Sequence, residues 1–176
     1  IKDFSLTYIP NSITFGTNLN RYYYELQNRD LSSVASNVSS IIPLTFSKNF
    51  MWNSDFNLNW NLTRNMKFNF TTNNSARVEE TLNTPVNKEL YPTEYQNWKD
   101  TVMTSLLSLG TPMAYQQNLK YTWQIPFKNI PVLDFVTASF QYSSTYKWDR
   151  SAMIADVDMG NVIGNQRSIS VNPSLN

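Results

Sequence analysis

Acidic side chains could bind a metal ion or exchange protons in this chain, but their spacing supports neither role. Asp156 and Asp158 could begin a cation-binding loop, although the remaining positions of an EF-hand pattern are missing. Paired-carboxylate catalysis needs a fixed geometry that a sequence cannot show, and four glutamates fall in one predicted loop, 79–113: Glu79, Glu80, Glu89 and Glu94. We interpret both sets as solvated loop residues.

The composition excludes most other site chemistry. The chain has no cysteine and no histidine, which removes thiolate ligands, disulfides and the commonest general base. It contains no G-x-S-x-G, P-loop or G-x-G-x-x-G motif. A net charge of +1 provides no basic field for nucleic acid. We therefore expect no enzymatic activity, no cofactor, no bound metal and no nucleic-acid partner.

Apolar and polar residues alternate with period two. Over residues 44–62, eight of the ten even-numbered positions are apolar, whereas Met51 is the one apolar residue at an odd position. Successive side chains of a strand point to opposite faces, so this pattern predicts a long strand with one apolar face. The other face is rich in asparagine, which makes up 23 of the 176 residues.

The same alternation predicts five further strands, at 12–27, 66–78, 115–127, 136–148 and, less completely, 169–175. Short connections at 8–11, 63–65 and 128–134 alternate with long loops at 28–43, 79–113 and 149–167. This order indicates an up-and-down sheet with all its short turns on one side. Outer-membrane barrels have short periplasmic turns and long extracellular loops.

One long loop, 79–113, is predicted to hold a helix over about 93–109. Thr93 is a suitable N-cap and Gly110 a suitable end. Three residues at helical spacing could contact a partner, namely Trp98, Val102 and Leu106. The alternative is that the same residues dock the helix on the rim of the barrel or inside its mouth, and we prefer this interpretation.

Strand length favours a membrane over a soluble core. Strands of soluble proteins run about 5–6 residues and membrane-spanning strands about 9–11. Most of the predicted segments have 13 to 19 residues. Eight large apolar side chains on one strand represent about 12–24 kcal/mol of transfer free energy, so that face cannot stay in water. Burying the asparagine face in a dry interior would leave costly unpaired amides.

We therefore predict an all-β fold, an antiparallel up-and-down transmembrane β-barrel segment with one helix in a long extracellular loop. Residues 1–176 would be a single segment of a larger barrel, because six strands cannot close a wide wet barrel. The start, IKDFSLTYIP, lacks the basic and apolar regions of a signal peptide, so we expect an exported protein of this kind to be cut from a longer precursor.

The two faces define two candidate sets. The residues predicted to line a hydrated lumen are Asn49, Asn53, Asn57, Asn59, Asn61, Asn69, Asn118, Gln124 and Gln141. The residues predicted to contact lipid are Phe46, Phe50, Phe56, Leu58, Trp60, Phe68, Phe70, Tyr121, Trp123 and Phe140.

Four stretches of the chain resemble the SprA/Sov family, giant outer-membrane proteins of Bacteroidota. They are PLTFSKNFMWNSDFNLNWNLTRNMKFNFTTNNSARVEE, YQNWKDTV, LKYTWQIPFKNIPVLDFVTASFQYSSTYKWD and GNVIGNQRSISVNPSLN. Together they cover most of residues 1–176 in the family's order. The ending VNPSLN departs from the family pattern, in which glycine is common near Pro173.

The resemblance implies a translocon channel of the type IX secretion system in the cell outer membrane. Such proteins carry folded cargo across that membrane and support gliding motility in some species. The resemblance also implies an exceptionally large barrel with a lateral opening, together with a PorV-like shuttle protein and a periplasmic plug protein as partners. Outer-membrane lipid, the remainder of the same barrel and secreted cargo proteins complete the expected partners.

Three other functions remain open from the residues. One is a nutrient porin or TonB-dependent receptor barrel. Another is an outer-membrane enzyme, although this segment has no histidine to activate a nucleophile. The third is a soluble lipid-binding barrel, which would not need detergent.

Overall fold

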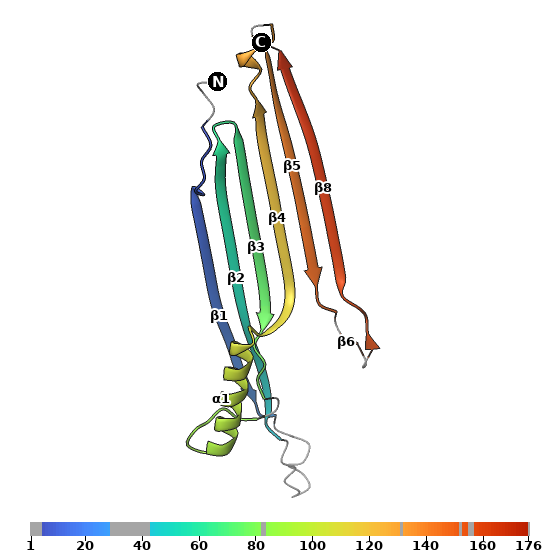
Figure 1. Cartoon of the computed structure of the whole chain (residues 1–176). Helices are drawn as coiled ribbons and strands as arrows, with labels where there is room; N and C mark the ends of the chain where they lie inside the picture. The colour runs from blue at the N-terminus through green and yellow to red at the C-terminus, as the bar shows by residue number, and fades with distance from the viewer. Residues whose placement is uncertain are drawn as a thin grey trace, which may run out of the picture. The chain divides into compact units, whose positions relative to one another are not determined.

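The computed structural model describes residues 5–28, 43–81, 84–130, 132–151, 153–154 and 157–175. Its six long strands are β1 (Ser12–Leu26), β2 (Thr45–Thr63), β3 (Met66–Arg77), β4 (Thr111–Ile125), β5 (Val136–Asp149) and β8 (Val162–Leu175). They lie in the sheet in chain order, with neighbouring strands antiparallel (Figure 1). The predicted antiparallel up-and-down arrangement is confirmed as an open sheet whose edge strands are β1 and β8.

The alternation predicted the bounds of most strands to within a few residues, but not that of β8. β8 begins at Val162, inside the predicted loop 149–167. Residues 162–167 show no clean alternation and include Gly164, yet their backbone pairs with residues 144–149 of β5. The remaining connection holds a small hairpin of β6 (Met153–Ile154) and β7 (Val157–Asp158). The predicted cation loop falls on this hairpin, and Asp156 lies outside the described residues.

The predicted helix is present as α1 (Pro92–Leu107). Thr93 does not cap it. Tyr91 takes the N-cap position without a side-chain hydrogen bond, and Pro92 follows in the first turn, where its missing N–H costs nothing. The helix ends at Leu107, two residues before the predicted end, and Leu109 and Gly110 then have φ of 64° and 69°. The Gly110 amide then donates to the Ser105 carbonyl at 2.8 Å.

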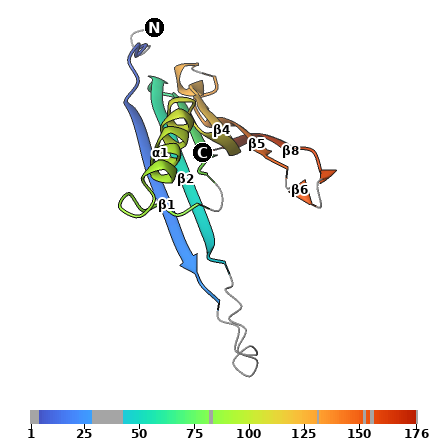
Figure 2. The same cartoon turned by 90° about the horizontal axis from the view of Figure 1, so that it is seen from below.

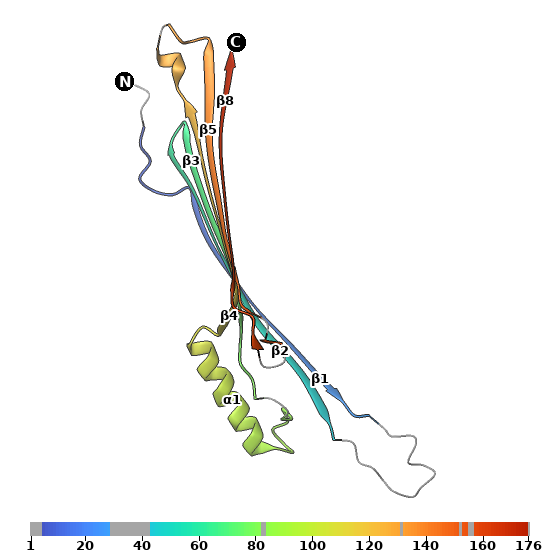
Figure 3. The same cartoon turned by 90° about the vertical axis from the view of Figure 1, so that its right-hand side faces the viewer.

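The chain divides into two compact units. Unit 1 consists of Ile1–Thr17, Asn53–Ser75 and Pro112–Asn176, and unit 2 of Asn18–Trp52 and Ala76–Thr111. The strands of unit 1 form a single layer, seen edge-on in Figure 3. Among its described residues, Thr63 alone is buried.

Unit 2 has a small core. Helix α1 lies alongside the ribbon formed by the ends of β1 and β2 (Figure 2). The buried residues of this unit are Ala76, Val78, Val102 and Ser105. Within the part of the chain that the structure describes, no helix is long and apolar enough to cross a membrane.

Candidate functional site: the two faces of the sheet

One face of unit 1 is apolar across several strands. Residues paired across neighbouring strands point to the same side of a sheet. On β4, β5 and β8, three successive rows of this face are Ile125–Ala138–Pro173, Trp123–Phe140–Val171 and Tyr121–Tyr142–Ile169. The predicted lipid-facing residues Tyr121, Trp123 and Phe140 therefore share one face, and Ile169 and Val171 continue it to the edge of the sheet.

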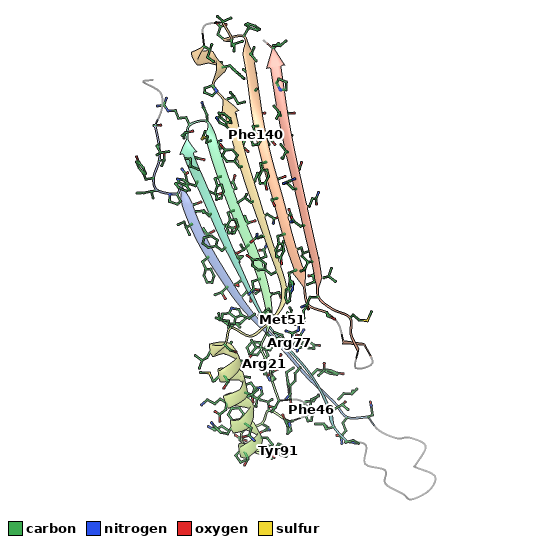
Figure 4. The ribbon with its side chains drawn as sticks, turned by 45° about the vertical axis from the view of Figure 1, so that its right-hand side comes forward. Arg21, Phe46, Met51, Arg77, Tyr91 and Phe140 are labelled. Atoms are coloured by element: carbon green, nitrogen blue, oxygen red, sulfur yellow. The ribbon has the colours of Figure 1, made fainter. Side chains whose placement is uncertain are left out.

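Aromatic contacts continue this face from strand to strand. Phe56 of β2 and Phe70 of β3 meet edge to face, with ring centroids 6.3 Å apart. Phe140 of β5, labelled in Figure 4, has its ring centroid 6.2 Å from that of Tyr121 on β4. Such pairs add about 0.5–1.5 kcal/mol to simple burial. The apolar face is therefore a packed surface formed by several strands.

The opposite face carries amides and hydroxyls that bond across the strands. Asn59 of β2 donates to the Ser12 hydroxyl of β1 at 3.0 Å and accepts from the side-chain amide of Asn69 on β3. On the same face, Ser75 of β3 donates to the Asn53 carbonyl oxygen at 2.7 Å. The predicted lumen-facing residues Asn53, Asn59 and Asn69 thus share one face of the sheet.

The same polar network extends to β5. Asn118 of β4 donates to the Thr71 hydroxyl of β3 at 3.5 Å and accepts from the Thr145 hydroxyl of β5 at 2.9 Å. These bonds satisfy some of the donors and acceptors of each side-chain amide. The side chains of this face are still half-buried or exposed. Neutral groups that bond to one another and still contact solvent suit a hydrated surface.

A few charges interrupt the polar face. Asp55 lies directly against Gly16 of β1, where any β-carbon would overlap its carboxylate. Lys147 pairs with Asp149 at 3.0 Å on β5. Asp55, Lys147 and Asp149 line one hollow of about 220 Å³ together with Asn53. Charges of both signs are thus close together on this face.

A larger hollow of about 1030 Å³ lies at the short-turn end of unit 1. Its lining includes the predicted lumen residue Gln124, the polar-face residues Thr137 and Ser139, and the cations Arg64 and Lys128. The hollow therefore carries two positive charges at this end of unit 1.

Unit 2 is organised around a carboxylate that the sequence had placed in a solvated loop. The Glu80 side chain is 4% exposed and accepts from Arg21 Nε at 2.7 Å. The indole nitrogen of Trp98 donates to the same oxygen at 2.6 Å. The Arg21 guanidinium also lies 4.9 Å from the Trp98 ring centre and 5.3 Å from that of Tyr23. Glu80 thereby joins α1 to β1.

The loop before α1 is bound to β2 in a similar way. Lys48 Nζ donates to the backbone oxygens of Thr81 and Thr84 at 2.8 and 2.6 Å. The amide of Glu79 donates to the hydroxyl of Ser105, in α1, at 2.9 Å. The helix-bearing segment is consequently held at several points within unit 2.

The three helix residues predicted to contact a partner lie differently. Val102 is buried, Trp98 bonds to Glu80 and Leu106 is half-buried. The side chains of Met103 and Leu107 are instead exposed. Partner binding by the helix stays a prediction, and the first two residues are already used within unit 2.

The strand residues of the two candidate sets fall mainly in unit 1. The exceptions are Asn49, Phe46 and Phe50, which belong to unit 2. There Phe46 stacks on Tyr23 at 6.4 Å, and the Lys48 ammonium lies 5.9 Å from its ring. Contact with lipid or with a lumen stays a prediction for both sets.

The sequence contains a signal for the Glu80 cluster in two basic residues at apolar positions. Arg21 and Lys48 occupy positions that the alternation assigns to the apolar side of their strands. A charged residue at an apolar position calls for an opposite charge. The sequence could not identify Glu80 as that partner, because it lies in an irregular segment of the chain.

Comparison with protein-family models and with curated proteins gives no match to this chain. Among the described residues, no group of three acidic, histidine or cysteine side chains could hold a metal ion. The features of the structure that point to a function are the apolar face and the amide face of the sheet.

Proposed function

We propose that this chain is a wall segment of an outer-membrane protein-conducting channel, the translocon of a type IX secretion system. One observation carries the proposal. Unit 1 is a single layer with an apolar aromatic face on one side and a bonded amide face on the other. A wall between hydrocarbon and water needs both of these surfaces.

The apolar face is the lipid side of the proposed wall. Its side chains are half-buried or exposed within unit 1, so this unit alone does not bury them. The proposed lipid-facing set in unit 1 consists of Phe56, Leu58, Trp60, Phe68, Phe70, Tyr121, Trp123 and Phe140. Hydrocarbon removes their surface from water without a second protein layer.

The amide face is the lumen side. Its side-chain amides offer neutral hydrogen-bond donors and acceptors to the water in the channel. These amides belong to Asn53, Asn57, Asn59, Asn61, Asn69, Asn118, Gln124 and Gln141. Uncharged amides hydrate a surface without strongly attracting either sign of charge, so cargo can pass without being held.

Unit 2 is the part that we place outside the hydrocarbon. A buried Glu80, its Arg21 partner and Lys48 would be expensive in lipid. Burial lowers the pKa of Lys48 from its ordinary value, and the nearby Glu80 carboxylate opposes this effect. Phe46 and Phe50, close to these groups, belong at the membrane–water boundary.

In the proposed channel, closure of the barrel is provided by the remainder of the same protein, beyond the edge strands β1 and β8. The resemblance to the SprA/Sov family supports this assignment, and the PorV-like shuttle, the plug protein and secreted cargo follow as proposed partners. A nutrient porin or TonB-dependent receptor is the competing function.

The test compares two neighbouring residues in the full-length secreting protein. Asn57→Cys and Leu58→Cys each introduce a cysteine into a chain segment that has none. A membrane-impermeant maleimide should label Asn57→Cys, and a cysteine-reactive crosslinker there should trap secreted cargo during export. Leu58→Cys is the matched control and should neither react with the maleimide nor crosslink to cargo.

Each outcome has a distinct meaning. Labelling at both positions would contradict a two-sided wall. Labelling at Asn57→Cys without any cargo adduct would leave the wall in place and favour the nutrient porin or receptor barrel.

A further inference from the structure

One cation interrupts the apolar face of unit 1. Arg167 of β8 pairs with Ser144 of β5, which pairs with Leu119 of β4. This row follows directly after the Tyr121–Tyr142–Ile169 row, so Arg167 projects from the apolar side and is exposed. The cation is thus on the face that the proposed wall turns toward lipid.

The polar residues around Arg167 mark the end of the apolar band. The next row away from the short turns is Gln117–Tyr146–Asn165, and the row after that is Tyr115–Trp148–Ile163. Tyr115 donates to Gln117 at 3.0 Å, and the rings of Tyr115 and Tyr146 lie 6.3 Å apart. Polar groups mixed with Tyr and Trp are typical of the boundary between hydrocarbon and headgroups.

The depth of Arg167 agrees with this boundary. Arg167 lies eight positions before Leu175, the last residue of β8 on this face. At a rise of about 3.4 Å per residue and a tilt of about 40°, this corresponds to about 21 Å along the membrane normal, within an apolar band of about 25 Å. An arginine side chain can extend the remaining few ångströms to the headgroups.

On the described strands β4, β5 and β8, no acidic residue shares the face of Arg167. Among the described residues, no ion pair includes it, and the nearest acid of β5, Asp149, lies on the polar face paired with Lys147. A guanidinium offers five donors that match phosphate oxygens. Ser144 and Asn165 add neutral hydrogen-bonding groups beside it.

Building on the proposed function, we infer that Arg167, with Ser144 and Asn165, binds the phosphate of an anionic lipid headgroup at the outer boundary of the membrane. The occupant is a lipid rather than a protein carboxylate, because the site lies where the apolar band ends on three strands. Its function would be to hold the barrel at a defined depth.

The test uses one reporter for both proposals. Ile169→Cys, two residues deeper on the same face, is labelled with bimane in the full-length protein and reconstituted in phosphatidylcholine vesicles. Quenching by brominated phosphatidylcholine reports contact with lipid. Stronger quenching by the same amount of brominated phosphatidylglycerol reports a local preference for an anionic headgroup.

The expected preference for phosphatidylglycerol is about fivefold, the effect of one basic residue at an anionic surface. Arg167→Gln should reduce the ratio of quenching by the two lipids to about one, and Arg167→Lys should keep most of the preference. Lys120→Gln removes the same charge from the opposite face of β4 and should leave it unchanged.

The two proposals fail differently. No quenching by either lipid would mean that this face does not meet the bilayer, and both the wall and the headgroup site would be wrong. Equal quenching by the two lipids, or a preference that survives in Arg167→Gln, would overturn the headgroup site and leave the wall standing.

Discussion

At the scale of single residues, position on the strand decides what a substitution costs. Asn57 and Leu58 are neighbours on β2, yet their side chains point to opposite faces. A polar or charged group is tolerated where water or amides surround it, and it is costly where hydrocarbon does. The same distinction explains why Arg167 stands out on its face while Lys120 does not.

Leu58→Arg should destabilise the barrel by about 2–4 kcal/mol if Leu58 lies near the bilayer midplane. The measurement is urea unfolding of the full-length barrel in vesicles, followed by tryptophan fluorescence. Asn57→Arg is the matched control and should change stability little. Equal losses in the two variants would argue against separate lipid and water faces.

At the scale of elements, α1 is held by a few polar contacts rather than by a large core. Glu80 bonds to Arg21 and Trp98, and the amide of Glu79 bonds to Ser105. A buried charge that loses its partner is expensive, whereas an exposed one is not. Among these contacts, the Glu80 carboxylate contributes most to the position of the helix.

Glu80→Ala should release α1, because it leaves the partly buried Arg21 without its anion at a cost of about 3–5 kcal/mol. Faster amide hydrogen exchange over residues 92–107 would show the release. Glu89→Ala, an exposed acid in the same segment, should leave exchange unchanged. Unaltered protection in Glu80→Ala would show that apolar contacts such as those of Val102 hold the helix.

At the scale of the whole molecule, the described chain exposes more apolar surface than a soluble domain keeps. Large exposed hydrophobic residues occur on both edge strands, among them Ile13 and Phe15 of β1 and Ile169 and Val171 of β8. Apolar patches of this kind mark surfaces that another protein or lipid covers, and they cause aggregation when they are left in water.

The isolated 176-residue chain should therefore need detergent to remain dispersed. Sedimentation velocity with and without a mild detergent measures this directly: we expect large aggregates in buffer and small particles in detergent. A monodisperse monomer in plain buffer would favour the soluble lipid-binding barrel and count against the wall.

The local pattern of residues was sufficient to determine the long strands, their two faces, their order and the presence of a helix before Gly110. The strands and their faces follow from period-two alternation, the order from the alternation of short and long connections, and the helix from helical spacing before a glycine. The polar start of β8 was missed, since its strand conformation comes from pairing with β5. Thr93 was wrongly chosen as the cap, since Pro92 begins the helix one residue earlier.

Only the tertiary structure brought together residues far apart in the chain. Arg21, Lys48, Glu80 and Trp98 come from four segments, and no local pattern encodes their meeting. The row that sets Arg167 beside Ser144 likewise depends on strand register. The physical reason is that alternation specifies which side a residue faces, whereas its neighbours on that side are determined by pairing and packing across the whole fold.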